Sequence, residues 1–126
     1  MGDADPYPAE YAEVQYSQSA TGPVLNVAVF RGDLNLAVVA ERVKTCNGVA
    51  EADGSTQQVA DVAVAALGTG TYAFRVDVAT AAPVTLLAEM VKVNGYVILG
   101  GIVAPSGAED QALLELTMAL VAGRAV

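Results

Sequence analysis

Residues 59–104 read VADVAVAALGTGTYAFRVDVATAAPVTLLAEMVKVNGYVILGGIVA, a series of apolar runs separated by short turns. Asn94 and Gly95 lie between the last two runs. Both residue types tolerate the positive φ that a type I′ hairpin turn requires at its central positions. The pattern therefore predicts consecutive antiparallel strands, of which the last two form a hairpin over residues 84–103.

The predicted turn also fixes how the two hairpin strands face each other. Val93 pairs with Tyr96, so Glu89 pairs with Gly100. Both faces of this hairpin are largely apolar, and each face needs cover from another part of the molecule. The predicted helices either divide between the two faces or leave some apolar area for a partner or ligand.

Two helices are predicted outside the strands. The first spans residues 34–46 and has Asp33 as its N-cap. The second spans residues 107–122, and the spacing of Ser106 and Glu109 at its start is typical of a capping box. Its apolar residues predict a mostly covered helix, with a buried stripe of Leu113, Leu116 and Leu120, widened by Leu114, Met118 and Val121.

The predicted elements follow the order β-β-α-β-β-β-β-α. We expect a single α+β domain over residues 11–126, with a mainly antiparallel sheet of about six strands packed with two helices. A chain of 126 residues suits one domain of this kind. Residues 1–10 contain two prolines and three acids without a periodic pattern, which predicts a flexible arm.

Charge and hydropathy exclude several classes of partner. The net charge is −8, with only six Lys and Arg residues, so a nucleic-acid partner is not expected. No apolar run approaches the roughly 20 residues of a membrane span. The first ten residues lack the basic end and apolar core of a signal peptide, so we expect an export signal to be either absent in nature or missing from this chain, in which no signal peptide is recognised.

The residue inventory argues against catalysis and metal binding. The chain has no histidine and one cysteine, Cys46, which removes the usual nucleophile-activating triads, zinc sites and CxxC redox pairs. Asp61, Asp77 and Glu89 are scattered through the predicted sheet, with no sign that they converge. We predict a non-enzyme without catalytic residues, metal or cofactor. Cys46 is expected to be a buried free thiol, the alternatives being an interchain bridge or a partner outside this chain.

Four residues are candidates for a ligand-binding site. Glu89 interrupts an apolar strand and faces Gly100, whose missing side chain leaves room for a ligand. Tyr72 and Phe74 share one strand face and can line an apolar pocket. The alternatives are that Glu89 lies at a sheet margin, that Gly100 and Gly101 form a bulge, and that the aromatic residues are ordinary core.

The order of elements resembles a known group of proteins. The helix ends in Cys46-Asn47-Gly48, an alternating strand covers residues 72–76, and the hairpin ends in Val93-Asn94-Gly95-Tyr96-Val97 before a closing amphipathic helix. This pattern is similar to secreted actinobacterial domains, namely small lipoproteins and the extracellular sensor domains of receptor Ser/Thr kinases, over about residues 24–121. A related resemblance is to mycobacterial lipoproteins with the layered α/β fold of the photosystem PsbP protein.

The resemblance implies extracytoplasmic binding or sensing. We therefore expect a non-catalytic binding or sensor-like domain of the actinobacterial cell envelope, which binds either a small apolar ligand or a protein partner. The alternative is a structural subunit that buries an apolar sheet face in a homodimer. A third possibility is a minor enzyme that uses carboxylates.

Overall fold

The computed structural model describes residues 11–17, 23–48, 50 and 54–124, so the predicted arm over residues 1–10 lies outside the described residues. The elements are β1 (Tyr11–Ser17), β2 (Val24–Arg31), α1 (Leu36–Lys44), β3 (Thr56–Asp61), β4 (Gly70–Ala79), β5 (Val84–Val93), β6 (Tyr96–Pro105) and α2 (Gln111–Arg124). Their order confirms the prediction. The third strand ends at Asp61, and residues 62–67 follow it without regular secondary structure.

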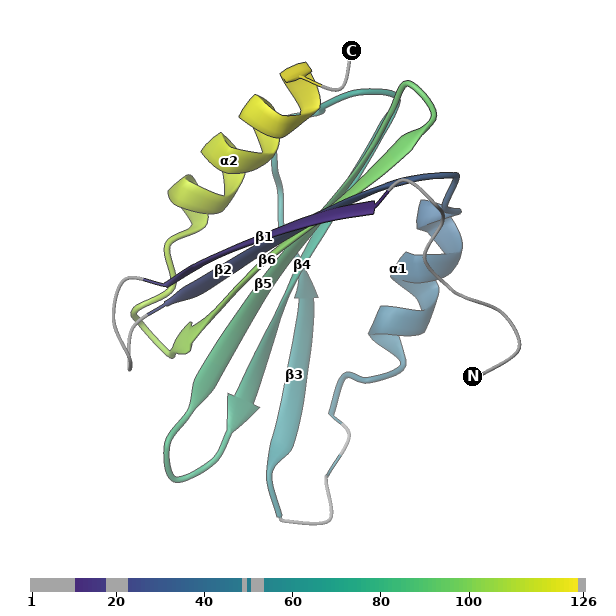
Figure 1. Cartoon of the computed structure of the whole chain (residues 1–126). Helices are drawn as coiled ribbons and strands as arrows, with labels where there is room; N and C mark the ends of the chain where they lie inside the picture. The colour runs from purple at the N-terminus through teal and green to yellow at the C-terminus, as the bar shows by residue number, and fades with distance from the viewer. Residues whose placement is uncertain (1–10, 18–22, 49, 51–53, 125–126) are drawn as a thin grey trace, which may run out of the picture.

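The strands form one antiparallel sheet in the order β1-β2-β6-β5-β4-β3. The predicted α+β class with a mainly antiparallel sheet is therefore confirmed. The two helices lie on opposite sides of this sheet (Figure 1). The long β5–β6 hairpin forms the middle of the sheet. One of its faces is therefore on the side of α2, and the other is on the side of α1.

The hairpin has the predicted register. Val93 pairs with Tyr96 and Glu89 pairs with Gly100. Asn94 has φ 55° and Gly95 has φ 82°, as a type I′ turn requires. Because the turn chemistry leaves few alternatives, these two residues fix which side chains of β5 and β6 share a face.

Both helices begin later than predicted, because a different residue caps each one. In α1 the carboxamide of Asn35 accepts hydrogen bonds from the amides of Ala37 and Val38. In α2 the carboxylate of Asp110 accepts from the amide of Leu113 at 3.0 Å. Asparagine and aspartate are both strong N-cap residues, so each helix begins directly after the one that precedes it.

The capping residues predicted from the sequence have other partners. Asp33 forms an ion pair with Lys92 at 2.8 Å. The Ser106 hydroxyl lies 2.9 Å from the Thr85 hydroxyl, and Glu109 accepts from the amide of Gly107 at 2.6 Å. The predicted capping box is therefore wrong, because both of its residues belong to the turn that precedes the helix.

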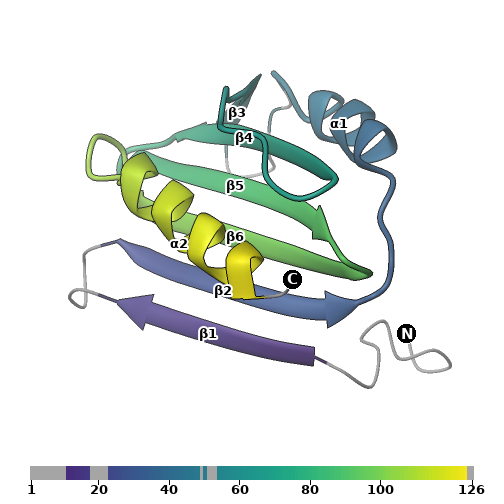
Figure 2. The ribbon, with the colours of Figure 1, turned by 90° about the horizontal axis from the view of Figure 1, so that it is seen from above.

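One side of the sheet, which we call the inner side, packs against α2 and holds the core. Figure 2 shows α2 lying over the middle strands. The core cluster comprises Leu25, Val27, Leu87, Val91, Val93, Ile98, Ile102, Ala104, Leu114, Met118 and Ala122. Helix α2 contributes residues spaced four apart, 114, 118 and 122, to this cluster.

This spacing corrects the predicted helix stripe. Leu116 and Leu120 were expected inside but are 59% and 57% exposed. Met118 is fully buried and lies over Gly100, where a β-carbon would overlap its sulfur atom. The helix is thus rotated so that its largest flexible side chain fills the space that a glycine leaves on β6.

The opposite side, which we call the outer face, is only partly covered. Helix α1 contacts β4 and β3 there, and none of its residues is buried. Most apolar residues of the outer face on β2, β5 and β6 are partly exposed, with Val103 43% exposed, whereas Val97 is fully buried; the partly exposed ones include Val24, Ala28, Phe30, Leu86, Met90, Leu99 and Val103. The helices therefore divide between the two faces, and apolar area is also left over.

Two further properties of the described chain bear on function. Cys46 is exposed, which makes the expected burial of its thiol wrong. It directly follows Thr45, the C-cap residue of α1. Within the described ranges, neither helix is long and apolar enough to cross a membrane.

Candidate functional site

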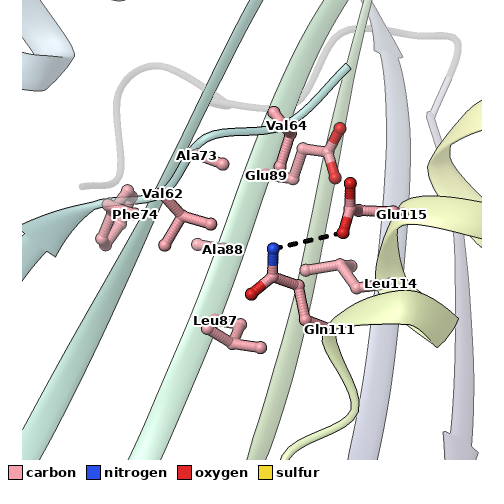
Figure 3. A pocket seen from close by; sticks show the side chains of 10 residues that line it. All are labelled: Val62, Val64, Ala73, Phe74, Leu87, Ala88, Glu89, Gln111, Leu114 and Glu115. Carbon is pink, nitrogen blue, oxygen red and sulfur yellow. Dashed lines mark hydrogen bonds between the residues drawn. The ribbon is translucent and has the colours of Figure 1, made fainter.

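A small pocket lies between α2, β4 and β5 on the inner side of the sheet (Figure 3). Its lining residues are Val62, Val64, Ala73, Phe74, Leu87, Ala88, Glu89, Gln111, Leu114 and Glu115. The space inside suffices for about one water molecule. Most of the lining is apolar, and the polar groups are two carboxyls and one carboxamide.

Glu89 is the most unusual residue of this pocket. It lies in the middle of β5, its side chain is 1% exposed, and its Oε1 atom has no hydrogen-bond partner among the described residues. Burial in this apolar environment raises the pKa of the Glu89 carboxyl to about 7, and the nearby charge of Glu115 raises it further in the same direction. A proton therefore binds to Glu89 near neutral pH.

Glu115 comes to the pocket from the opposite wall. It lies on α2 one turn after Gln111, whose Nε2 donates to Glu115 Oε2 at 3.2 Å. Figure 3 shows the carboxyl groups of Glu89 and Glu115 facing each other across the pocket. The sequence analysis did not single out Glu115. The signal that could have found it is its position next to Leu114, on a helix that packs on β5 and β6.

Gly100 does not provide the room for a ligand that its sequence position suggested. It lies opposite Glu89 as predicted, but Met118 and Leu114 of α2 occupy the space above it. The predicted void is therefore wrong, because glycine here permits close approach of a helix. The alternatives are also wrong: Glu89 is central in the sheet, and its pairing continues without a bulge through Gly100 and Gly101.

Tyr72 and Phe74 lie apart from the carboxyl pair. They alternate along β4 with Ala73, the residue that pairs with Glu89, so they project to the outer face. Their rings stack with centroids 5.7 Å apart, and the Tyr72 hydroxyl donates to Asp61 at 2.8 Å. Burial, helped by Asp61, raises the pKa of Tyr72 to about 12. Phe74 touches the pocket, whereas Tyr72 does not line it.

A second polar cluster on the inner side was also missed by sequence reasoning. The guanidinium of Arg75 donates two hydrogen bonds of 2.9 Å to Asp77 and contacts Glu109 at 3.5 Å. Asp77 also accepts from the Thr85 hydroxyl at 2.6 Å. Hydrogen bonding to Arg75 and then Thr85 holds the pKa of Asp77 below its usual value. This cluster ties the sheet to the turn before α2.

The arrangement suits a proton or a single water molecule. The carboxyl pair can hold a proton or one water, but the pocket does not accommodate an organic substrate. Among the residues placed by the structure, no three His, Cys, Asp or Glu side chains come together in a way that could hold a metal ion. No protein-family model, curated protein or solved structure matches this chain.

Proposed function

We propose that this chain is a non-catalytic binding domain that binds another protein through its outer face. The observation that supports the proposal is the unequal cover of the two sides of the sheet. Helix α2 covers the inner side, whereas the outer face keeps partly exposed apolar residues on three adjacent strands, with Val103 43% exposed. Contiguous exposed apolar area of this kind is typical of interaction sites.

The shape of the outer face favours a protein over a small apolar ligand. Strands β2, β6 and β5 have 8, 10 and 10 residues, which gives an apolar strip roughly 30 Å long and roughly 15 Å wide. Sites for small molecules are usually concave, with volumes of about 300–1,000 Å³. The pocket beside Glu89 is far smaller, with space for about one water molecule. A broad sheet surface is better matched by the surface of another protein.

We place the domain in the cell envelope of an actinobacterium and regard it as sensor-like. This placement rests on the resemblance of its element order to secreted lipoproteins and receptor-kinase sensor domains. Fractionation of the native cells, followed by immunoblotting for the full-length protein, tests whether the protein reaches the cell envelope. Recovery in the cytosolic fraction contradicts it.

The second candidate function is a structural subunit that forms a homodimer through the same face. The favouring observation is electrostatic: Lys92 is the charged residue on the outer side of β5, and Asp33 neutralises it at 2.8 Å. Two outer faces can therefore meet without opposing like charges, although the whole chain carries −8. Such a dimer is isologous, with Val103 of each copy near the other sheet.

Two substitutions test the proposal and separate its two forms. Val103→Glu places a charge on the outer face, and Leu120→Glu places the same charge on the exposed side of α2 as a matched control. For a homodimer, light scattering after size exclusion shows a dimer for the wild type and Leu120→Glu, and a monomer for Val103→Glu. For a different protein partner, all three are monomers, and a protein that co-purifies from native cells is lost with Val103→Glu only. Equal loss in both variants, or loss with Leu120→Glu alone, contradicts the proposal.

A further inference from the structure

The contact between α2 and the sheet contains a carboxyl group that no cationic side chain of the described residues neutralises. Glu89 is 1% exposed and lies between the core residues Leu87 and Val91 on β5. Its Oε1 has no partner among the described residues. Burial of an ionised, unpaired carboxylate in apolar surroundings is costly, so the neutral acid is the form that this position favours.

Each element packed against Glu89 presents different groups to it. Strand β4 presents Ala73, strand β6 presents Gly100, and the segment after β3 presents Val62 and Val64. Helix α2 presents Leu114, Gln111 and Glu115. Within the described chain, Glu115 is thus the titratable group that faces Glu89.

Arg75 is the cation nearest along the inner side of β4, but it is already engaged. It pairs across the sheet with Leu87, two residues before Glu89. Its guanidinium binds Asp77 at 2.9 Å and Glu109 at 3.5 Å. Glu89 therefore faces a second carboxyl group and not a cationic side chain.

Glu115 is held where its carboxylate can accept a hydrogen bond from a protonated Glu89. Gln111 fixes Glu115 Oε2 through a 3.2 Å hydrogen bond on the same helix. The two carboxyl groups face each other in Figure 3, and the space that they line accommodates about one water. A protonated Glu89 can donate its O–H to the Glu115 carboxylate, either directly or through that water.

We propose that one proton shared by Glu89 and Glu115 fastens α2 to the sheet, and that loss of this proton to solvent loosens the helix. With the proton bound, the pair carries a single negative charge and one hydrogen bond. Without it, two carboxylates oppose each other across an apolar contact, and like charges in such surroundings repel strongly. The device is independent of the proposed outer face, which lies on the other side of the sheet.

The helix, rather than the strand, is the part that yields. Glu89 belongs to β5, which is paired on both sides with β4 and β6. Glu115 belongs to α2, which is attached to the sheet through side chains such as Met118 and Leu114. Backbone pairing of β5 therefore survives the loss of the proton, whereas the packing of α2 weakens.

The pH range follows from the direction of the shift. The pKa of Glu89 is about 7 in the folded protein and 4.5 ordinarily, so the folded state binds this proton more tightly than the unfolded state. The resulting stabilisation is complete below about pH 4.5 and is lost as pH rises through about 7. The chain has no histidine, whose titration usually dominates this range.

Hydrogen exchange measured by NMR at pH 6 and pH 8 tests the proposal. The protection factors of α2 amides, corrected for intrinsic exchange, are divided by those of the β5–β6 hairpin amides in the same sample. We expect this ratio to fall by roughly tenfold from pH 6 to pH 8 in the wild type, since one pKa unit corresponds to a factor of ten. In Glu89→Gln, which mimics the neutral acid, the ratio stays constant.

Two further variants make the outcome decisive. Glu41→Gln removes an exposed acid on α1 and should behave like the wild type. Glu115→Gln removes the repelling charge, so it should show a smaller fall than the wild type, and it serves as the test if Glu89→Gln does not fold. An unchanged ratio in the wild type, or a fall in Glu89→Gln as large as that in the wild type, overturns the proposal. Full restoration at pH 8 by added calcium or magnesium also overturns it in favour of a cation.

Discussion

The two sides of the sheet use apolar residues in different ways. On the inner side, Met118 of α2 fits over Gly100, and the strand residues beneath the helix are almost completely buried. On the outer face, α1 has no buried residue, and most apolar side chains of three strands remain partly exposed, with the buried Val97 as an exception. Close packing is known to carry most of the stability of a small domain. The difference indicates that the inner side contributes more of the packing that holds the fold together than the outer face does.

The largest expected effect comes from the centre of the inner side. Met118→Ala removes a fully buried side chain and leaves a cavity over Gly100, which should lower the free energy of unfolding by about 3 kcal/mol. Leu116→Ala, on the exposed side of the same helix, should change it by less than about 0.5 kcal/mol. Urea denaturation followed by circular dichroism measures both. Similar losses in the two variants would show that α2 does not pack as described.

A pair of adjacent glycines gives the next largest contrast. A β-carbon at Gly100 meets Met118 and Leu114, so Gly100→Val should destabilise the fold by about 2 kcal/mol. A β-carbon at Gly101 meets only atoms at 3.4 Å or beyond, so Gly101→Val on the outer face should be nearly neutral. Thermal unfolding of the two variants side by side measures the contrast. A larger loss in Gly101→Val would reverse the assignment of the two faces.

A truncation on α1 should have a smaller effect. Leu36 lies near Gly70, but it is only partly buried, so Leu36→Ala should cost about 1 kcal/mol. Val38→Ala, at an exposed position of α1, serves as the control and should cost less. Denaturation midpoints in urea measure both. A loss in Leu36→Ala as great as that in Met118→Ala would show that the outer side supports the fold equally.

The smallest effect is expected from the ion pair of Asp77, which is partly exposed. Its pKa lies below 3.8 because it accepts from Arg75 and Thr85. The stabilisation is therefore present above about pH 3.8 and is lost as pH falls through the lowered value, opposite in sign to that of Glu89. Asp77→Asn should remove up to about 1 kcal/mol of acid dependence between pH 4 and pH 2. Unfolding free energies at several pH values measure it, and an unchanged acid limb contradicts the assignment.

The hairpin could be predicted because its information is local. Asn94 and Gly95 adopt the positive φ that their types favour, and the alternation of β5 and β6 then fixes the pairing of Glu89 with Gly100. The order of elements follows from similarly local signals. The class and register therefore needed no knowledge of tertiary packing.

The candidate site could not be predicted, because it depends on how α2 crosses the sheet. A helix with apolar residues on several sides offers more than one stripe at helical spacing, and the leucine stripe through Leu116 and Leu120 was the wrong one. The observed rotation follows from the fit of Met118 to Gly100, which links residues on different elements. That rotation also brings Glu115 close to Glu89. Because the buried stripe of the helix was predicted wrongly, the carboxyl pair could not be predicted either.

The position of β2 beside β6 has a consequence for the order of folding. Arg31 pairs with Tyr96 and Val24 with Val103, so the first described hairpin joins the sheet through residues near the end of the chain. A ribosome must release the last hairpin before β2 finds its neighbour, and closing so long a loop is slow in comparison with forming local hairpins. During synthesis we therefore expect one edge of β2 to lack its partner strand until β6 emerges, and unpaired strand edges of this kind are prone to aggregation.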